Sequence, residues 1–193
     1  YRATRPCNPP IQPSLSWNTG IIFTPVSPIA SNLPTIPIRE RIAPSDTVFV
    51  DGSCLHLPCK DLRTGASAYY VPGQVKFAHE LPGADISSQR TEIYALLLVL
   101  HHFRGRITVA TDCSAVIKGL AALKSEQRLF FLSHCDNRDL WLQVKAAFDV
   151  FPGDVQCIKV KAHVSMACRS QDPFLTAGNI EVDKLARSLA TER

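Results

Sequence analysis

The stretch TVFVDGS at residues 47–53 decides how the rest of the chain is interpreted. Its β-branched and aromatic residues predict a buried strand. The strand ends on a carboxylate, Asp51, which a glycine follows at once. A single aspartate in such a place is usually a turn former. Asp51 therefore indicates a functional site only if other acids occupy comparable positions along the chain.

The elements expected beyond this strand alternate in type. The sequence predicts further strands at 67–71, 74–80, 106–111 and 155–162, and helices at 90–103, 114–123, 138–149 and 179–192. Asp136 and Asn137 are candidate caps for the third helix. Three strands followed by alternating helices and strands predict an α/β domain with a mixed sheet.

Residues 1–44 differ in composition from the rest of the chain. They hold nine of the fourteen prolines, too many for a helix and too irregular for a strand ladder. We interpret 1–44 as a proline-rich linker and 45–193 as the folded domain; packing of this segment against an upstream domain is the alternative. Because the chain begins with Tyr1 and its one methionine is Met166, we expect it to be part of a longer polypeptide.

Overall composition narrows the class of protein. With 193 residues, 46% apolar residues and a net charge of +4, the chain is typical of a globular domain, and its charge alone does not identify a nucleic-acid binder. The longest apolar run, residues 93–100, is far shorter than the roughly 20 residues that span a bilayer, so we expect no membrane association. Seven scattered cysteines, an odd number, favour reduced thiols and an intracellular protein.

Four acids lie at the ends of expected elements. They are Asp51, Glu92, Asp112 and Asp183. Taken singly, Asp112 is also placed to cap the following helix, and Glu92 to complement a helix dipole. Carboxylates that gather in one place repel each other unless a cation lies between them, and Mg²⁺ prefers such oxygen ligands. Two ions about 3.5–4 Å apart would suit phosphodiester hydrolysis.

Six motifs, in order, resemble those of type 1 ribonuclease H, in its cellular form and in the form appended to retroelement reverse transcriptases. The motifs are VFVDGSC, QRTEIYAL, VATDCSAVIKGL, DLWLQV, KVKAH and GNIEVDKLAR, between residues 47 and 190. The resemblance implies a ribonuclease H-like fold with a mixed five-stranded sheet flanked by helices. It also implies endonucleolytic cleavage of the RNA strand of RNA–DNA hybrids, with an upstream reverse transcriptase domain as a partner in the same polypeptide.

By motif, the resemblance assigns the site residues. Asp51, Glu92, Asp112 and Asp183 match the metal-binding acids for two Mg²⁺ ions, which Mn²⁺ replaces in some conditions, and His163 matches a histidine that assists proton transfer or product departure. The substrate contacts that it implies are Gly52, Ser53, Cys54, Ser88, Gln89, Arg90, Ser114 and Asn179. Arg90 is placed to contact a phosphate or simply to face solvent.

Three other interpretations stay open at this point. Cys54, His56 and Cys59, or more loosely Cys157, His163 and Cys168, have the residue types of a zinc site, although neither set contains a paired CxxC motif. A catalytically inactive module that binds nucleic acid or joins domains would keep the same fold. A free cellular enzyme is the alternative to a polyprotein domain.

Overall fold

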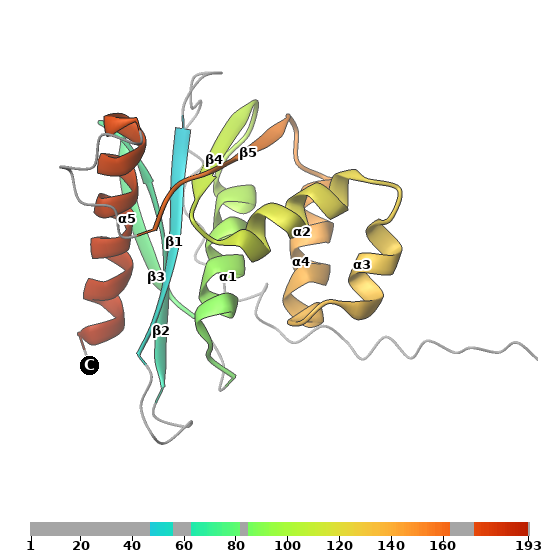
Figure 1. The fold of residues 1–193 in the computed structure, drawn as a ribbon, viewed down its shortest axis with the longest axis horizontal. Helices are drawn as coiled ribbons and strands as arrows, with labels where there is room; N and C mark the ends of the chain where they lie inside the picture. Colours follow the sequence, from blue (N-terminus) through green and yellow to red (C-terminus); the bar gives the residue numbers. More distant parts are fainter. Residues whose placement is uncertain (1–46, 56–62, 82–84, 163–171, 193) are drawn as a thin grey trace, which may run out of the picture.

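A computed structural model describes residues 47–55, 63–81, 85–162 and 172–192. The strands are β1 (Thr47–Leu55), β2 (Thr64–Val71), β3 (Val75–Glu80), β4 (Ile107–Thr111) and β5 (Val155–Lys159). The helices are α1 (Ser88–His102), α2 (Ser114–Lys124), α3 (Arg128–His134), α4 (Arg138–Asp149) and α5 (Pro173–Thr191). The α/β class and the mixed sheet predicted from the sequence are confirmed (Figure 1).

The described strands form one five-stranded sheet in the order β3-β2-β1-β4-β5. β1, β2 and β3 are antiparallel neighbours, whereas β1, β4 and β5 run parallel. Strand β1 therefore lies at the centre, and its first residues, Thr47 to Phe49, pair with β4. The topology brings the residues that follow β4 beside the middle of β1, which is where Asp51 lies.

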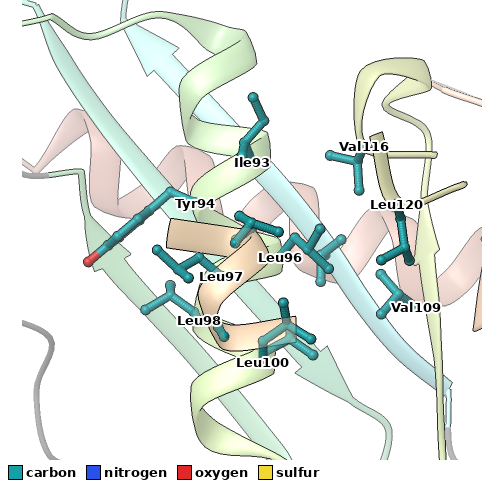
Figure 2. Close-up of a cluster of buried hydrophobic side chains, with 14 of the residues drawn as sticks. Ile93, Tyr94, Leu96, Leu97, Leu98, Leu100, Val109, Val116 and Leu120 are labelled. Carbon is teal, nitrogen blue, oxygen red and sulfur yellow. The ribbon is translucent and has the colours of Figure 1, made fainter. Parts of the chain in front are cut away.

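Helix α1 is buried along nearly its whole length. Its residues from 90 to 100 are all buried between the sheet and α4, which explains a leucine-rich sequence with no polar face (Figure 2). Ser87 caps the helix, because its hydroxyl accepts a hydrogen bond from the Arg90 backbone N–H at 3.3 Å. A helix held on several sides is a fixed support for any side chain at its first turns.

Helix α5 covers the opposite face of the sheet (Figure 1). Side chains alternate along β1, so that Val48 and Val50 join the α1 core while Phe49 packs under α5 with Val182 and Ala186. Gly178 permits this contact, since a Cβ there would lie 2.2 Å from the Phe49 ring. The central strand is thus held between α1 and α5, and both helices come close to Asp51.

Three features of the fold differ from the predicted elements. Helix α3 was not predicted; its Leu129 and Phe130 are 71% and 67% exposed, so it lacks the apolar periodicity of a packed helix. Helix α5 begins at Pro173, six residues before the predicted start, with Asp172 as its N-cap. The cap expected from Asn137 is absent, because Asn137 adopts a left-handed conformation (φ 56°) and its side chain makes no capping hydrogen bond.

Within the described residues, no helix has both the length and the apolar character to cross a membrane. The proposed linker, residues 1–44, lies outside the described part of the chain, and its role stays a prediction.

Candidate active site

Three of the four predicted acids meet in space. Asp51 lies in the middle of β1, Glu92 in the second turn of α1, and Asp112 directly after β4. One carboxylate oxygen from each lies within 4.8 Å of the others, and among the described residues these three form the one group that could hold a metal ion. Asp51 and Glu92 are 6% and 9% exposed. Acids 61 residues apart in sequence therefore share one partly enclosed position.

A close approach between β1 and α1 sets the geometry of the triad Asp51, Glu92 and Asp112. A Cβ at Gly52 would lie 2.4 Å from both the Glu92 backbone nitrogen and the Thr91 hydroxyl, so a glycine is needed there. The Ser67 hydroxyl, from β2, donates a 2.6 Å hydrogen bond to the Thr91 carbonyl. The start of α1 is consequently fixed against both β1 and β2.

The electrostatics of the triad are those of crowded, buried carboxyl groups. Burial raises the pKa of Asp51 to about 7, with further increases from the charges of Asp112 and Asp183. Burial, and then the charge of Asp51, raises the pKa of Glu92 well above its usual value. A hydrogen bond between the two carboxyl groups lowers the pKa of Asp51 and raises that of Glu92, so the two groups titrate as a pair.

The fourth predicted acid, Asp183, faces the same pocket from α5 but does not join the triad. Its Oδ1 accepts a 2.7 Å hydrogen bond from Arg187 Nε, one helical turn further along. Both side chains line the pocket with the triad, and the Asp183 charge acts on Asp51. Arg187 was missed in the sequence, although its spacing of four residues from Asp183 is the spacing of helical ion pairs.

The pocket has a volume of about 480 Å³. Four of the predicted substrate contacts line it: Gly52, Ser53, Cys54 and Ser88. Leu55, Ala162, Ala190 and Thr191 complete the wall together with the acids and Arg187. The second half of β1 and the first turn of α1 therefore lie next to the carboxylates, as a role in substrate binding would require.

The other predicted contacts have different surroundings. Asn179 is buried, and its side-chain amide donates to Asp112 Oδ2 at 3.4 Å, which suits the positioning of that carboxylate. Gln89 is exposed and accepts a hydrogen bond from Asn137. The exposed Ser114 hydroxyl accepts a 3.3 Å hydrogen bond from Lys159. A role for these three residues in substrate binding stays a prediction.

Arg90 joins two helices. Its side chain is 7% exposed and makes two hydrogen bonds, of 2.8 and 2.7 Å, to the carboxylate of Asp139 on α4. The alternative that Arg90 faces solvent is wrong, because the guanidinium lies under the start of α4 and is neutralised there. This pairing gives no support to the predicted phosphate contact.

Asp139→Asn should destabilise the protein by about 2–3 kcal/mol, because it leaves the buried Arg90 charge without its partner. The loss is expected to stay below that of a wholly buried pair, since Asp139 is 45% exposed. Urea unfolding at pH 7 measures it. Glu181→Gln, which breaks exposed pairs with Lys76 and Lys184, is the control and should leave the urea midpoint nearly unchanged. Equal effects of both variants would contradict the structural role of Arg90.

The histidine and the cysteines of the sequence analysis are only partly described. His163, His56, Cys59 and Cys168 lie outside the described residues, so the proton-transfer role of His163 and both zinc alternatives stay untested. The four described cysteines, Cys54, Cys113, Cys135 and Cys157, are free thiols. Burial raises the pKa of the Cys157 thiol to about 11, as for a small apolar residue in a strand.

A mixed sheet whose central strand presents a carboxylate cluster to an open pocket has the class of site used in metal-dependent phosphoryl transfer. The sequence matches the model of the RNase H family over residues 44–191, and the chain therefore belongs to that family. No curated protein sequence matches it significantly.

Among solved structures, the chain is similar to the foamy viral protease-reverse transcriptase in complex with double-stranded DNA. The match has a TM-score of 0.57 and 16% sequence identity, and it covers 82% of this chain and 99% of the other. At this identity the likeness supports the fold. It agrees with the fold that the sequence motifs implied.

Proposed function

We propose that this chain is an endonuclease that hydrolyses the RNA strand of RNA–DNA hybrids, leaving 3′-hydroxyl and 5′-phosphate ends. The observation that carries the proposal is the convergence of Asp51, Glu92 and Asp112 within 4.8 Å in a pocket of about 480 Å³. Membership of the RNase H family supports the choice of substrate.

The residues of the pocket fit a pair of divalent cations, for which we propose Mg²⁺, with Mn²⁺ as a substitute. All donors are carboxylate oxygens, which suit a hard cation. Glu92 Oε2 is buried and has no hydrogen-bond partner among the described residues. Burial and the neighbouring carboxylates raise the pKa values of Asp51 and Glu92, an unfavourable arrangement that a bound cation would relieve. Bound there, the cations would supply Lewis-acid stabilisation of charge at the scissile phosphate.

The chain's own residues would prepare the site in three ways. Asp51 and Glu92, held by the sheet and α1, would hold the cations as carboxylates, and their raised pKa values mean that protons would be released when cations bind. Asn179 orients the Asp112 carboxylate through the 3.4 Å hydrogen bond. Gly52, Ser53 and Ser88 present backbone and hydroxyl groups of the kind that contact the 2′-hydroxyls of an RNA strand across a wide minor groove.

We further propose that the domain, residues 45–193, works inside cells as part of a longer retroelement-type polypeptide with a reverse transcriptase domain. The reverse transcriptase named for the foamy viral structure supports this placement. A free cellular enzyme remains the alternative, and residues 1–44 would be the connecting linker.

Incubation of an end-labelled RNA–DNA hybrid with the protein and Mg²⁺ tests the proposed activity. The wild-type protein should cut the RNA strand at internal positions, and Asp112→Asn should be slower by at least about a thousandfold. A catalytically inactive module would bind the hybrid without cutting it. Cleavage by both proteins, or by neither, would contradict the proposal.

A further inference from the structure

Helix α5 carries an ion pair that faces the pocket. Asp183 and Arg187 are one turn apart, their Nε to Oδ1 distance is 2.7 Å, and both line the pocket with the triad. The side chains of Asp183 and Arg187 are 29% and 55% exposed. Arg187 is therefore a cation located at the rim of a strongly acidic site.

This ion pair changes the role of Asp183. Its negative charge is close enough to raise the pKa of Asp51, yet its oxygens are not part of the group whose members lie within 4.8 Å of one another. The Asp183 carboxylate is instead neutralised by a guanidinium. A divalent cation that takes Asp183 as a ligand has to replace that hydrogen bond.

We propose that Arg187 is an exchangeable counter-ion: it holds Asp183 apart from the triad until a divalent cation binds, and it then contacts a phosphate of the nucleic-acid backbone. The inference rests on the proposed function, which supplies the cation and the substrate. Guanidinium groups bind carboxylates and phosphates through the same charged hydrogen bonds, so one partner can replace the other.

The neighbouring cation Lys184 shows why the assignment is specific to Arg187. Lys184 lies on the same helix, but it pairs with Glu181, at 3.2 Å, in an exposed surface network that also contains Lys76. Lys184 does not line the pocket. Both side chains are largely exposed, at 68% and 55%, so each can be replaced without opening the core.

Calorimetric titration of the folded protein with Mn²⁺, without nucleic acid, tests the first step. Arg187→Gln should bind Mn²⁺ about two- to fivefold more tightly than the wild-type protein, because an exposed ion pair no longer competes for Asp183. Lys184→Gln removes the same charge from the same helix and should bind like the wild-type protein. Arg187→Lys keeps the charge and should fall between them.

Steady-state cleavage of the hybrid in Mg²⁺ tests the second step. Arg187→Gln should raise KM for the hybrid about threefold to tenfold, with kcat within twofold of the wild-type value. Lys184→Gln should leave both constants near the wild-type values. A purely structural role of Arg187 would not tighten Mn²⁺ binding.

The outcomes separate the parts of the inference. Mn²⁺ binding to Arg187→Gln that equals or falls below that of Lys184→Gln overturns the counter-ion role. Tighter Mn²⁺ binding with an unchanged KM overturns the phosphate contact alone. A wild-type protein that neither binds Mn²⁺ nor cuts the hybrid overturns the proposed function and this inference with it, whereas cleavage with indistinguishable variants overturns only the inference.

Discussion

Asp51→Asn is expected to stabilise the cation-free protein at pH 8 by roughly 2–3 kcal/mol. The folded state holds the pKa of Asp51 at about 7 instead of its ordinary 3.8, chiefly through burial. The folded protein therefore keeps a proton that the unfolded chain releases between about pH 4 and 7. The contribution of this proton to the free energy of unfolding is fully present below about pH 4 and is lost as the pH rises through about 7.

Asparagine at position 51 does not ionise, so the variant does not lose this stability as the pH rises. Its side-chain oxygen can still accept the hydrogen bond that the Gly52 N–H donates to Asp51 Oδ1 at 2.8 Å. Urea unfolding in EDTA at pH 5 and pH 8 should show the gap between variant and wild type widening with pH. Mg²⁺ should raise the stability of the wild type more than that of the variant, and hybrid cleavage by the variant should fall at least about a thousandfold.

The exposed Asp136 provides a control, since Asp136→Asn changes the same kind of group outside the pocket. Its stability should follow that of the wild-type protein at both pH values. A destabilised Asp51→Asn at pH 8 in EDTA would show that the carboxylates are not under electrostatic strain, and the argument for a cation site would lose its support.

Gly52→Ala should remove most of the activity and also weaken the fold. The added methyl group would lie 2.4 Å from the Glu92 backbone nitrogen, and neither β1 nor the buried α1 can easily move. We expect a loss of about 2–4 kcal/mol in stability from overpacking. Since the start of α1 has to shift, Glu92 should leave the triad, and cleavage should fall at least about a hundredfold.

Gly119→Ala separates these two effects. Its Cβ would lie 2.0 Å from the Trp141 ring, so Gly119→Ala overpacks α2 against α4 to a similar degree without affecting the contact between β1 and α1. Assayed well below the melting temperatures of both variants, Gly119→Ala should remain active while Gly52→Ala does not. Similar activity of the two variants would mean that the approach of β1 to α1 does not position Glu92.

The sequence carried enough information for the sheet, the buried helix and three members of the site. Asp51 and Asp112 come directly after apolar strand residues, and Glu92 lies in the early turns of the leucine-rich helix, so their places were predictable and the motif order supplied their convergence. Asp51 does not end its strand as expected, because β1 continues to Leu55. The start of α5 could also have been predicted, because Asp172 is a typical N-cap residue and Pro173 a typical first residue of a helix. Asn179 was instead taken as the start, six residues late.

The features that the sequence did not predict depend on which side chains meet in the folded structure. Arg90 has a partner, Asp139, that is 49 residues away, and no local pattern connects them. Helix α3 is short and largely exposed, so its sequence does not show the apolar periodicity of a buried helix. Asp183 was predicted as a metal ligand from its motif, but whether it pairs with Arg187 or with an ion depends on which cation is present.

The chain order of the acids would link the proposed nuclease activity to completion of the domain. Asp51 comes from the first described strand and Asp183 from the last helix, and α5 packs on β1 through Phe49, Val182 and Ala186. A nascent or truncated chain that ends before α5 has the first three acids but lacks the cover on one face of the central strand. Unfinished copies would thus be harmless to cellular hybrids, a safeguard that comes from topology without an inhibitor.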